Sequence, residues 1–98
     1  MRVLITGASG GIGAACVQRF LDEGHEVVGF DLLLAAIEHE RYRHLIVDVR
    51  EPDSFPGNLE PQVIVNVAGT QDSADDIAAN LRGTINVTER YAFVGEGL

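Results

Sequence analysis

A glycine-rich turn near the start of this 98-residue chain constrains its fold more than any other stretch. The turn follows a short apolar run, and it opens a segment with helical spacing; its residues are Thr6, Gly7, Ala8, Ser9, Gly10, Gly11, Ile12 and Gly13. A strand, a glycine turn and a helix in this order direct backbone N–H groups and the positive end of a helix dipole at an anion. Glycine keeps side chains away from that anion and supplies positive φ where the turn needs it. The turn therefore predicts a phosphate cradle, to which we assign all of its residues except Ala8.

The apolar runs that follow the turn alternate with segments of helical spacing. We expect strands at residues 2–6, 27–30, 44–47 and 63–67, a helix at 11–23 that stops at Gly24, one helical turn at 52–55, and a long helix after residue 73. Strands that alternate with helices form a parallel sheet with right-handed crossovers. The sequence thus predicts a single α/β domain, residues 1–98, with a Rossmann-like doubly wound parallel sheet of about four strands in the order 3-2-1-4.

Three further expectations concern the helices. The apolar sextet at 32–37 and the polar residues up to 41 favour a short helix that is buried, covered by a partner, or one wall of an adenine pocket. Ser73 and Asp76 resemble a capping pair for the long helix. One face of that helix is predicted to pack inward, and Gly83 marks a close contact because glycine costs about 1 kcal/mol in a helix; the face comprises Ile77, Leu81, Ile85, Thr88 and Tyr91.

An acidic residue, Asp31, ends the second predicted strand about 20 residues past the glycines. A carboxylate at this place accepts the ribose 2′-hydroxyl of NAD, and it repels the 2′-phosphate of NADP. The turn contains no arginine that would attract that phosphate. Because Asp31 follows this glycine turn, we favour a functional role for Asp31 and its neighbour Leu32 over the alternative that Asp31 is a solvated loop acid. We also expect the cofactor to be NAD rather than NADP.

Composition limits the partners and the compartment. The net charge of −8 argues against nucleic acids and anionic membrane surfaces. No apolar run approaches the roughly 18–20 residues of a membrane span, and the chain begins directly in a predicted strand rather than in a signal peptide. The single cysteine, Cys16, permits no internal disulfide, so we expect a reducing, cytoplasmic compartment. The three histidines and the cysteine lack metal-ligand spacing, which predicts no metal site.

Four motifs in order resemble the short-chain dehydrogenase/reductase family, over nearly all of this chain but only the first half of a family member. They are Thr6-Gly7-x-x-x-Gly11-x-Gly13, Asp31, Asp48-Val49, and Asn66-Val67-Ala68-Gly69, with Val67 in place of the family's second Asn. The resemblance implies that Asp48 and Val49 contact the adenine, with Asp48 bonding its amino group. It also implies that Asn66, Ala68 and Gly69 steady the sheet and line the cofactor. Asn80 is similar to the helix Asn of the family's catalytic tetrad, although a plain helix-surface Asn is the alternative.

The chain departs from the family at its chemical centre. The family pairs a tyrosine with a lysine four residues later, but Tyr42 is followed by Ile46, Tyr91 by Gly95, and the chain has no lysine. An unassisted tyrosine with a pKa near 10 is a poor acid–base catalyst. We therefore expect a cofactor-binding half without appreciable dehydrogenase turnover.

Two other functions and one assembly state remain to be considered. A non-catalytic nucleotide sensor or interaction module agrees with the missing lysine. A serine hydrolase is a remote alternative, because Gly7-Ala8-Ser9-Gly10-Gly11 has the Gly-x-Ser-x-Gly pattern and an aspartate and His39 or His44 follow it. The outer edge of the fourth strand and the uncovered long helix predict a homo-oligomer.

Overall fold

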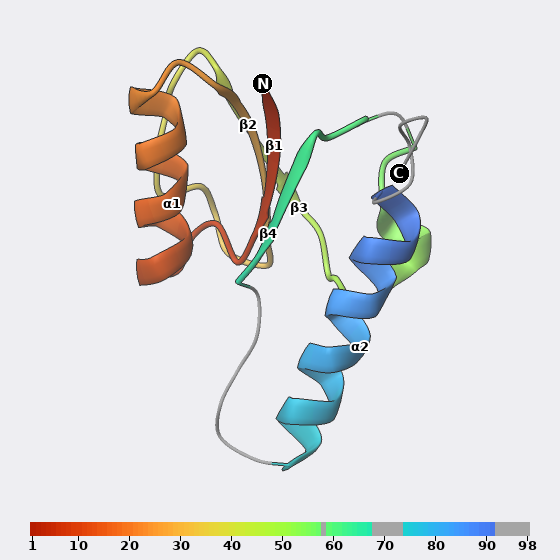
Figure 1. The fold of residues 1–98 in the computed structure, drawn as a ribbon. Helices are drawn as coiled ribbons and strands as arrows, with labels where there is room; N and C mark the ends of the chain where they lie inside the picture. The colour runs from red at the N-terminus through yellow and green to blue at the C-terminus, as the bar shows by residue number, and fades with distance from the viewer. Residues whose placement is uncertain (58, 68–73, 92–98) are drawn as a thin grey trace.

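The computed structural model describes residues 1–57, 59–67 and 74–91, the last segment without the side chains of residues 74–80. Its four strands form one parallel sheet in the order β3-β2-β1-β4 (Figure 1). The strands are β1 (Arg2–Thr6), β2 (Glu26–Asp31), β3 (Tyr42–Ile46) and β4 (Val63–Asn66). The helices are α1 (Gly11–Asp22), the short 3₁₀ turn η1 (Pro52–Ser54) and α2 (Ala74–Tyr91). The predicted fold class and strand order are confirmed.

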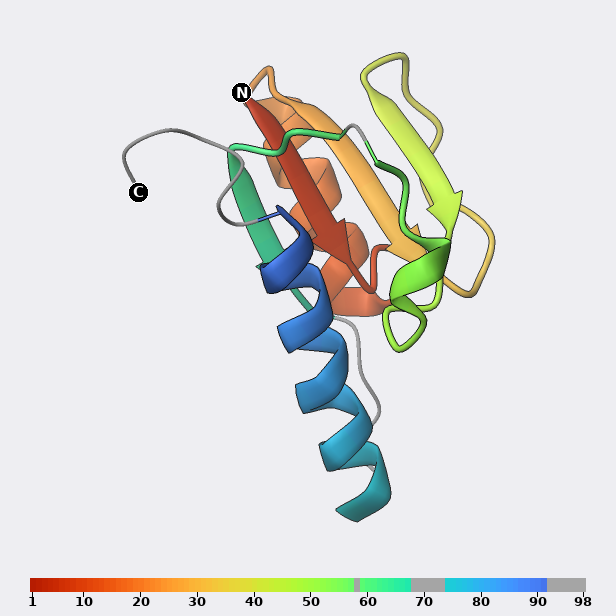
Figure 2. The ribbon, with the colours of Figure 1, turned by 90° about the vertical axis from the view of Figure 1, so that its right-hand side faces the viewer.

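The sheet is covered on both faces. α1 lies on one face, and α2 and η1 lie on the other (Figures 1 and 2). Alternate residues of β1 supply the two cores, as strand geometry requires: Val3 and Ile5 pack with α1, whereas Leu4 packs on the α2 side. The continuous apolar run of this strand is thus explained by burial on both faces.

Three aromatic rings hold the C-terminal end of α2 on the sheet. The ring centroids of Phe30, Phe55 and Tyr91 lie 5.9–6.2 Å from one another. The Tyr91 hydroxyl donates a hydrogen bond to the Pro56 carbonyl at 2.8 Å. The other end of α2 extends past the carboxyl ends of the strands (Figure 2). These contacts therefore anchor the C-terminal end of α2 to the sheet.

The short helix expected at 32–41 is wrong, because this segment, here called the β2–β3 loop, is irregular. Side chains bond the backbone groups that a helix would use. Asp31 Oδ1 accepts the amide of Leu33 at 3.0 Å, and Ser9 Oγ donates to the carbonyl of Leu34 at 2.6 Å. Such local bonds compete with helix formation. Of the three expected roles of the segment, burial is excluded for Leu34, which is 82% exposed, whereas a partner surface and an adenine pocket wall stay predictions.

The inward face predicted for α2 is wrong in part. Leu81 is 61% exposed and Thr88 is also exposed, whereas Gly83, Val87 and Tyr91 are buried. These three residues lie four apart, so they form one stripe of the helix. The expected close contact at Gly83 is confirmed, because a Cβ there would lie 2.6 Å from Val49 Cγ2.

Two smaller expectations concern the ends of the helices. Gly24 ends α1 with a φ of 90°, a conformation that favours glycine. The Ser73–Asp76 capping pair lies outside the described residues. A search of the described residues finds no helix that combines the length and apolarity needed to span a bilayer.

Candidate nucleotide-binding site

The glycine turn lies at the carboxyl end of β1, where the strand order changes direction between β1 and β4. In open α/β sheets ligands bind at this place. Backbone bonds fix the turn to β2: the amides of Gly7 and Ala8 donate to the Phe30 carbonyl at 2.8 and 3.2 Å. The Gly10 amide donates to the Gly7 carbonyl at 3.2 Å. These amides hold the turn itself, so they are not the ones offered to a ligand.

The first turn of α1 supplies the amides that a phosphate needs. The helix begins after Gly10 with no side-chain cap, and its first turn carries no acidic residue. The first helical bond runs from the Ala14 amide to the Gly10 carbonyl at 2.8 Å. The amides of Gly11, Ile12 and Gly13 precede it and point out of the helix end. This end combines N–H donors with the positive end of the helix dipole, which is an anion site.

The glycines of the turn serve different purposes. Gly7 has a φ of 71°, which side chains rarely adopt. A Cβ on Gly13 would lie 2.6 Å from the Gly7 carbonyl carbon, so the helix could not pack on the turn. A Cβ on Gly11 would meet nothing within 4 Å. The protein's own packing therefore requires glycine at 7 and 13, whereas at 11 it leaves open space beside the helix end.

Asp31, at the end of β2, is bound to the glycine turn. Its Oδ2 accepts the Ser9 amide at 2.9 Å, and its Oδ1 accepts the Leu33 amide. Each carboxylate oxygen can accept a second hydrogen bond, so Asp31 can also receive ribose hydroxyls. The neighbouring Leu32 is exposed. The structure thus brings the carboxylate of β2 to the glycine turn, as the sequence predicted.

The side chains of Tyr42 and His44 support the β2–β3 loop. The Tyr42 hydroxyl lies 2.7 Å from His44 Nδ1, and His44 Nε2 lies 2.8 Å from the Leu33 carbonyl. Burial, and then the negative charge of Asp31, raise the pKa of Tyr42 to about 12, so its hydroxyl stays protonated. Sequence reasoning missed this support, although Tyr42 and His44 lie two residues apart on β3 and so share one face of the sheet; the contact with Leu33 depends on the path of the loop.

These contacts bear on the hydrolase alternative. The Ser9 hydroxyl donates to the Leu34 carbonyl, and the His44 ring contacts Tyr42 and Leu33. A serine nucleophile needs a base within hydrogen-bond reach. Among the described residues, Ser9 and His44 are each bonded to other partners rather than to one another.

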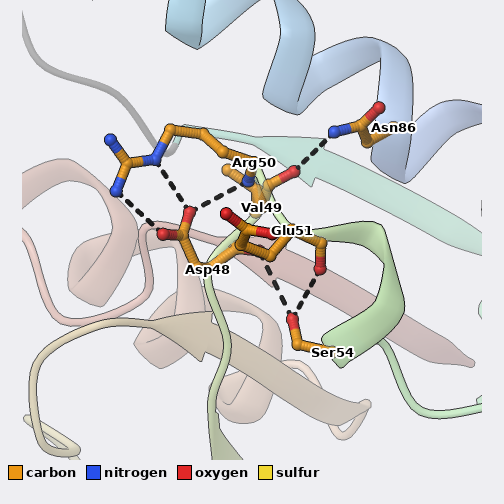
Figure 3. Close-up of polar contacts among 6 residues, drawn as sticks. All are labelled: Asp48, Val49, Arg50, Glu51, Ser54 and Asn86. Carbon is orange, nitrogen blue, oxygen red and sulfur yellow. Dashed lines mark hydrogen bonds and ion pairs between the residues drawn. The ribbon is translucent and has the colours of Figure 1, made fainter.

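Asp48 follows β3 and forms the third part of the site. Its carboxylate accepts Arg50 Nε at 2.9 Å and a terminal Arg50 nitrogen at 2.8 Å (Figure 3). The side-chain hydrogen bond from Arg50 lowers the pKa of Asp48, so the group stays ionised. The next residue, Val49, is half-buried, and its carbonyl accepts Asn86 Nδ2 at 3.0 Å. Sequence reasoning missed Asn86, although it lies three residues after Gly83 and so on the same helix face.

Hydrogen bonds of the Thr6 hydroxyl join β1 to the end of β4 at the start of the glycine turn. The Thr6 hydroxyl lies 3.3 Å from Asn66 Oδ1 and accepts the Val67 amide at 3.1 Å. Thr6 is 1% exposed, so it shapes the turn rather than presenting a surface. Ala68 and Gly69 lie outside the described residues, as does the side chain of Asn80. Among the described residues, no three His, Cys, Asp or Glu side chains gather as a metal site would require.

A 3-2-1-4 parallel sheet, with a glycine turn at its switch point and acids at the ends of β2 and β3, defines a Rossmann-like domain. Comparison with known families then places it more closely. The chain belongs to the NAD dependent epimerase/dehydratase family, whose model matches residues 3–93. The resemblance to short-chain dehydrogenases is thereby confirmed.

Known relatives share the whole of this chain but are much longer. A UDP-glucose 4-epimerase of Mycolicibacterium smegmatis is 30% identical over 97% of this chain and 36% of its own length. A short-chain dehydrogenase of Leptospira borgpetersenii with bound NAD+ is 22% identical, with a TM-score of 0.79 over 91% of this chain and 43% of that one. The Bordetella bronchiseptica enzyme WbmH in complex with NAD+ is 24% identical, with a TM-score of 0.78 over 91% of this chain and 34% of that one. The chain thus spans about a third of the curated relative, and these structures share its fold.

Proposed function

We propose that this chain binds NAD(H) as the cofactor-binding part of an epimerase- or dehydrogenase-type protein. The observation that carries the proposal is the uncapped start of α1 beside the open space at Gly11. The amides of Gly11, Ile12 and Gly13 would hold the pyrophosphate there. The two structures named above, which have bound NAD+, support the choice of ligand. The bound cofactor would supply hydride transfer.

Asp31 and Asp48 would contact different parts of the adenosine half of the cofactor. Asp31, fixed by the Ser9 and Leu33 amides, would accept ribose hydroxyls. Its negative charge favours NAD, because a 2′-phosphate at this place would face a carboxylate. Asp48 would accept the adenine amino group, since its low pKa keeps it an acceptor. Leu32, beside Asp31, would border the adenine.

We propose that this chain alone binds the cofactor without turning it over. The chain has no lysine, and its Tyr42 is neutral and bonded to His44. Asn80 would then be a remnant of the family's tetrad, and a nucleotide sensor is the second candidate. In a longer protein of the family, residues outside these 98 would complete the chemistry.

A calorimetric titration tests the proposal. NAD should bind to the wild-type chain, and NADP should bind at least about tenfold more weakly. The variant Asp31→Ser should narrow that difference, because it removes the charge that repels the 2′-phosphate. Absence of binding by either dinucleotide at millimolar concentration would refute a cofactor role. Steady NADH formation from an alcohol or sugar would refute the claim that the chain lacks turnover.

We also propose that the chain is a cytoplasmic homo-oligomer. β4 pairs only with β1 in the described sheet, and Leu81 on α2 is exposed. An unpaired edge and an exposed apolar residue are features that a second copy covers. The free thiol of Cys16 suits a reducing compartment. Sedimentation equilibrium should show a dimer or larger species, and a monomer at micromolar concentration would contradict this.

A further inference from the structure

Helix α2 contacts the turn after β3 through two positions of one face. Gly83 approaches so closely that a Cβ there would lie 2.6 Å from Val49 Cγ2. Three residues further on, Asn86 Nδ2 donates to the Val49 carbonyl at 3.0 Å (Figure 3). The glycine brings the helix near, and the amide then bonds the backbone of the turn. The two residues therefore form one contact between α2 and Val49.

The same turn orients the Asp48 carboxylate. Asp48 Oδ1 accepts the Arg50 amide at 2.9 Å, in addition to the bonds from the guanidinium. The Asp48 carbonyl accepts the Glu51 amide at 2.9 Å, and it lies 3.4 Å from Ser54 Oγ. All of these partners lie within six residues of Asp48. The bond from Asn86 is different, because its donor lies 37 residues along the chain.

We propose that Asn86 is a positioning residue for the adenine end of the cofactor site. This inference rests on the proposed function, in which Asp48 receives the adenine amino group. Asn86 fixes the carbonyl of Val49 and hence the chain direction immediately after Asp48. The local bonds shape the turn, whereas Asn86 fixes the turn against the helix. Because coupling between sites is reciprocal, adenine binding at Asp48 stabilises α2.

The test compares Asn86→Ala with the control Thr88→Ala, whose side chain is exposed on the same helix. NMR titrations measure the affinity of the purified protein for AMP, which carries the adenine, and for pyrophosphate, which needs only the start of α1. In Asn86→Ala, AMP should bind about threefold to tenfold more weakly, the equivalent of one lost hydrogen bond. Pyrophosphate affinity should not change, and the control should match the wild type for both. A general loss of structure would weaken both ligands together.

A second measurement needs no variant and covers the case in which Asn86→Ala does not fold. AMP should slow amide hydrogen exchange in residues 81–91 of the wild-type protein, and pyrophosphate should not. The inference is overturned if NAD binds the wild type but Asn86→Ala keeps wild-type AMP affinity, or if AMP leaves exchange in α2 unchanged. If the wild type binds neither NAD nor AMP, the proposed function fails, and this inference fails with it.

Discussion

Two glycines of the turn should respond in opposite ways to the same added methyl group. Gly11→Ala should leave the fold intact and weaken NAD binding, whereas Gly13→Ala should damage the fold itself. The positions are two residues apart, and both lie in the first turn of α1. They differ in what surrounds them, because position 11 faces open space and position 13 faces the backbone of Gly7 and Ala8. Comparison of the two variants therefore distinguishes a glycine needed for ligand binding from a glycine needed for packing.

The expected magnitudes follow from these surroundings. At position 13 the new Cβ would lie 2.6 Å from the Gly7 carbonyl carbon and 3.1 Å from Ala8 Cα. Both neighbours are backbone atoms, so the turn or the helix must shift, at a cost of about 1–3 kcal/mol or more. At position 11 the new Cβ would meet no atom within 4 Å apart from its chain neighbours and the backbone of its own helix, so alanine should raise the unfolding free energy by about 0.4–1 kcal/mol through the unfolded chain.

Urea unfolding followed by circular dichroism measures the first effect, and calorimetric titration with NAD measures the second. Gly11→Ala should be at least as stable as the wild type. It should bind NAD at least about tenfold more weakly than the wild type, because its methyl group occupies the space beside the phosphate-binding amides. Gly13→Ala should unfold at clearly lower urea concentration. If Gly11→Ala binds NAD like the wild type, the open space at position 11 is not the phosphate site. If it unfolds as easily as Gly13→Ala, the packing argument is wrong.

Four other substitutions test single contacts. Arg50→Gln should raise the pKa of Asp48, which NMR titration measures. It should cost less than about 1 kcal/mol at pH 7, because the Arg50 side chain is 56% exposed and solvent screens the pair. That cost should vanish as the pH falls through the lowered pKa of Asp48, since the ionised pair contributes only above it. Burial raises the pKa of Tyr42 to about 12, so between about pH 10 and 12 this tyrosine ionises only in the unfolded chain. The unfolding free energy of the wild type should therefore fall over this pH range. Urea unfolding at each pH should show a smaller fall for Tyr42→Phe. Phe30→Ala, which removes a fully buried ring, should cost about 3–5 kcal/mol in thermal unfolding. Ser9→Ala should cost about 1 kcal/mol in urea unfolding, since it removes the hydroxyl bond to the β2–β3 loop.

The order of elements could be predicted because it depends on short-range signals. Continuous apolar runs mark buried parallel strands, and β1 was predicted with its observed bounds. Gly24 follows the end of α1, Pro52 begins η1, and Pro56 and Pro61 lie in the connection that leads to β4. Alternation of strands with helices then leaves few topologies, among which the order 3-2-1-4 is common. These signals need no knowledge of which side chains meet.

The β2–β3 loop could not be predicted because its conformation is set by distant partners. Its apolar residues have the composition of a helix, and the local bond against one is that from the Leu33 amide to Asp31, two residues earlier. The bonds that fix it come from Ser9, Asp31 and His44, which lie in three different elements or turns. The inward face of α2 was mispredicted for a similar reason. Hydrophobicity pointed to Leu81, which is exposed, whereas the helix contacts Val49 at Gly83, where a Cβ would lie 2.6 Å from Val49 Cγ2.

The glycine turn itself combines two requirements that a sequence pattern cannot separate. The amides of Gly7, Ala8 and Gly10 bond the protein's own carbonyls, and they would do so with or without a ligand. The amides of the first helical turn have no side-chain cap, and the space beside Gly11 is open. Glycine at the N-cap costs such a turn a few tenths of a kcal/mol relative to a capping side chain, and it leaves the first amides of α1 without a side-chain partner. The absence of that cap in an otherwise well-bonded turn is the physical reason to assign the helix start to a phosphate.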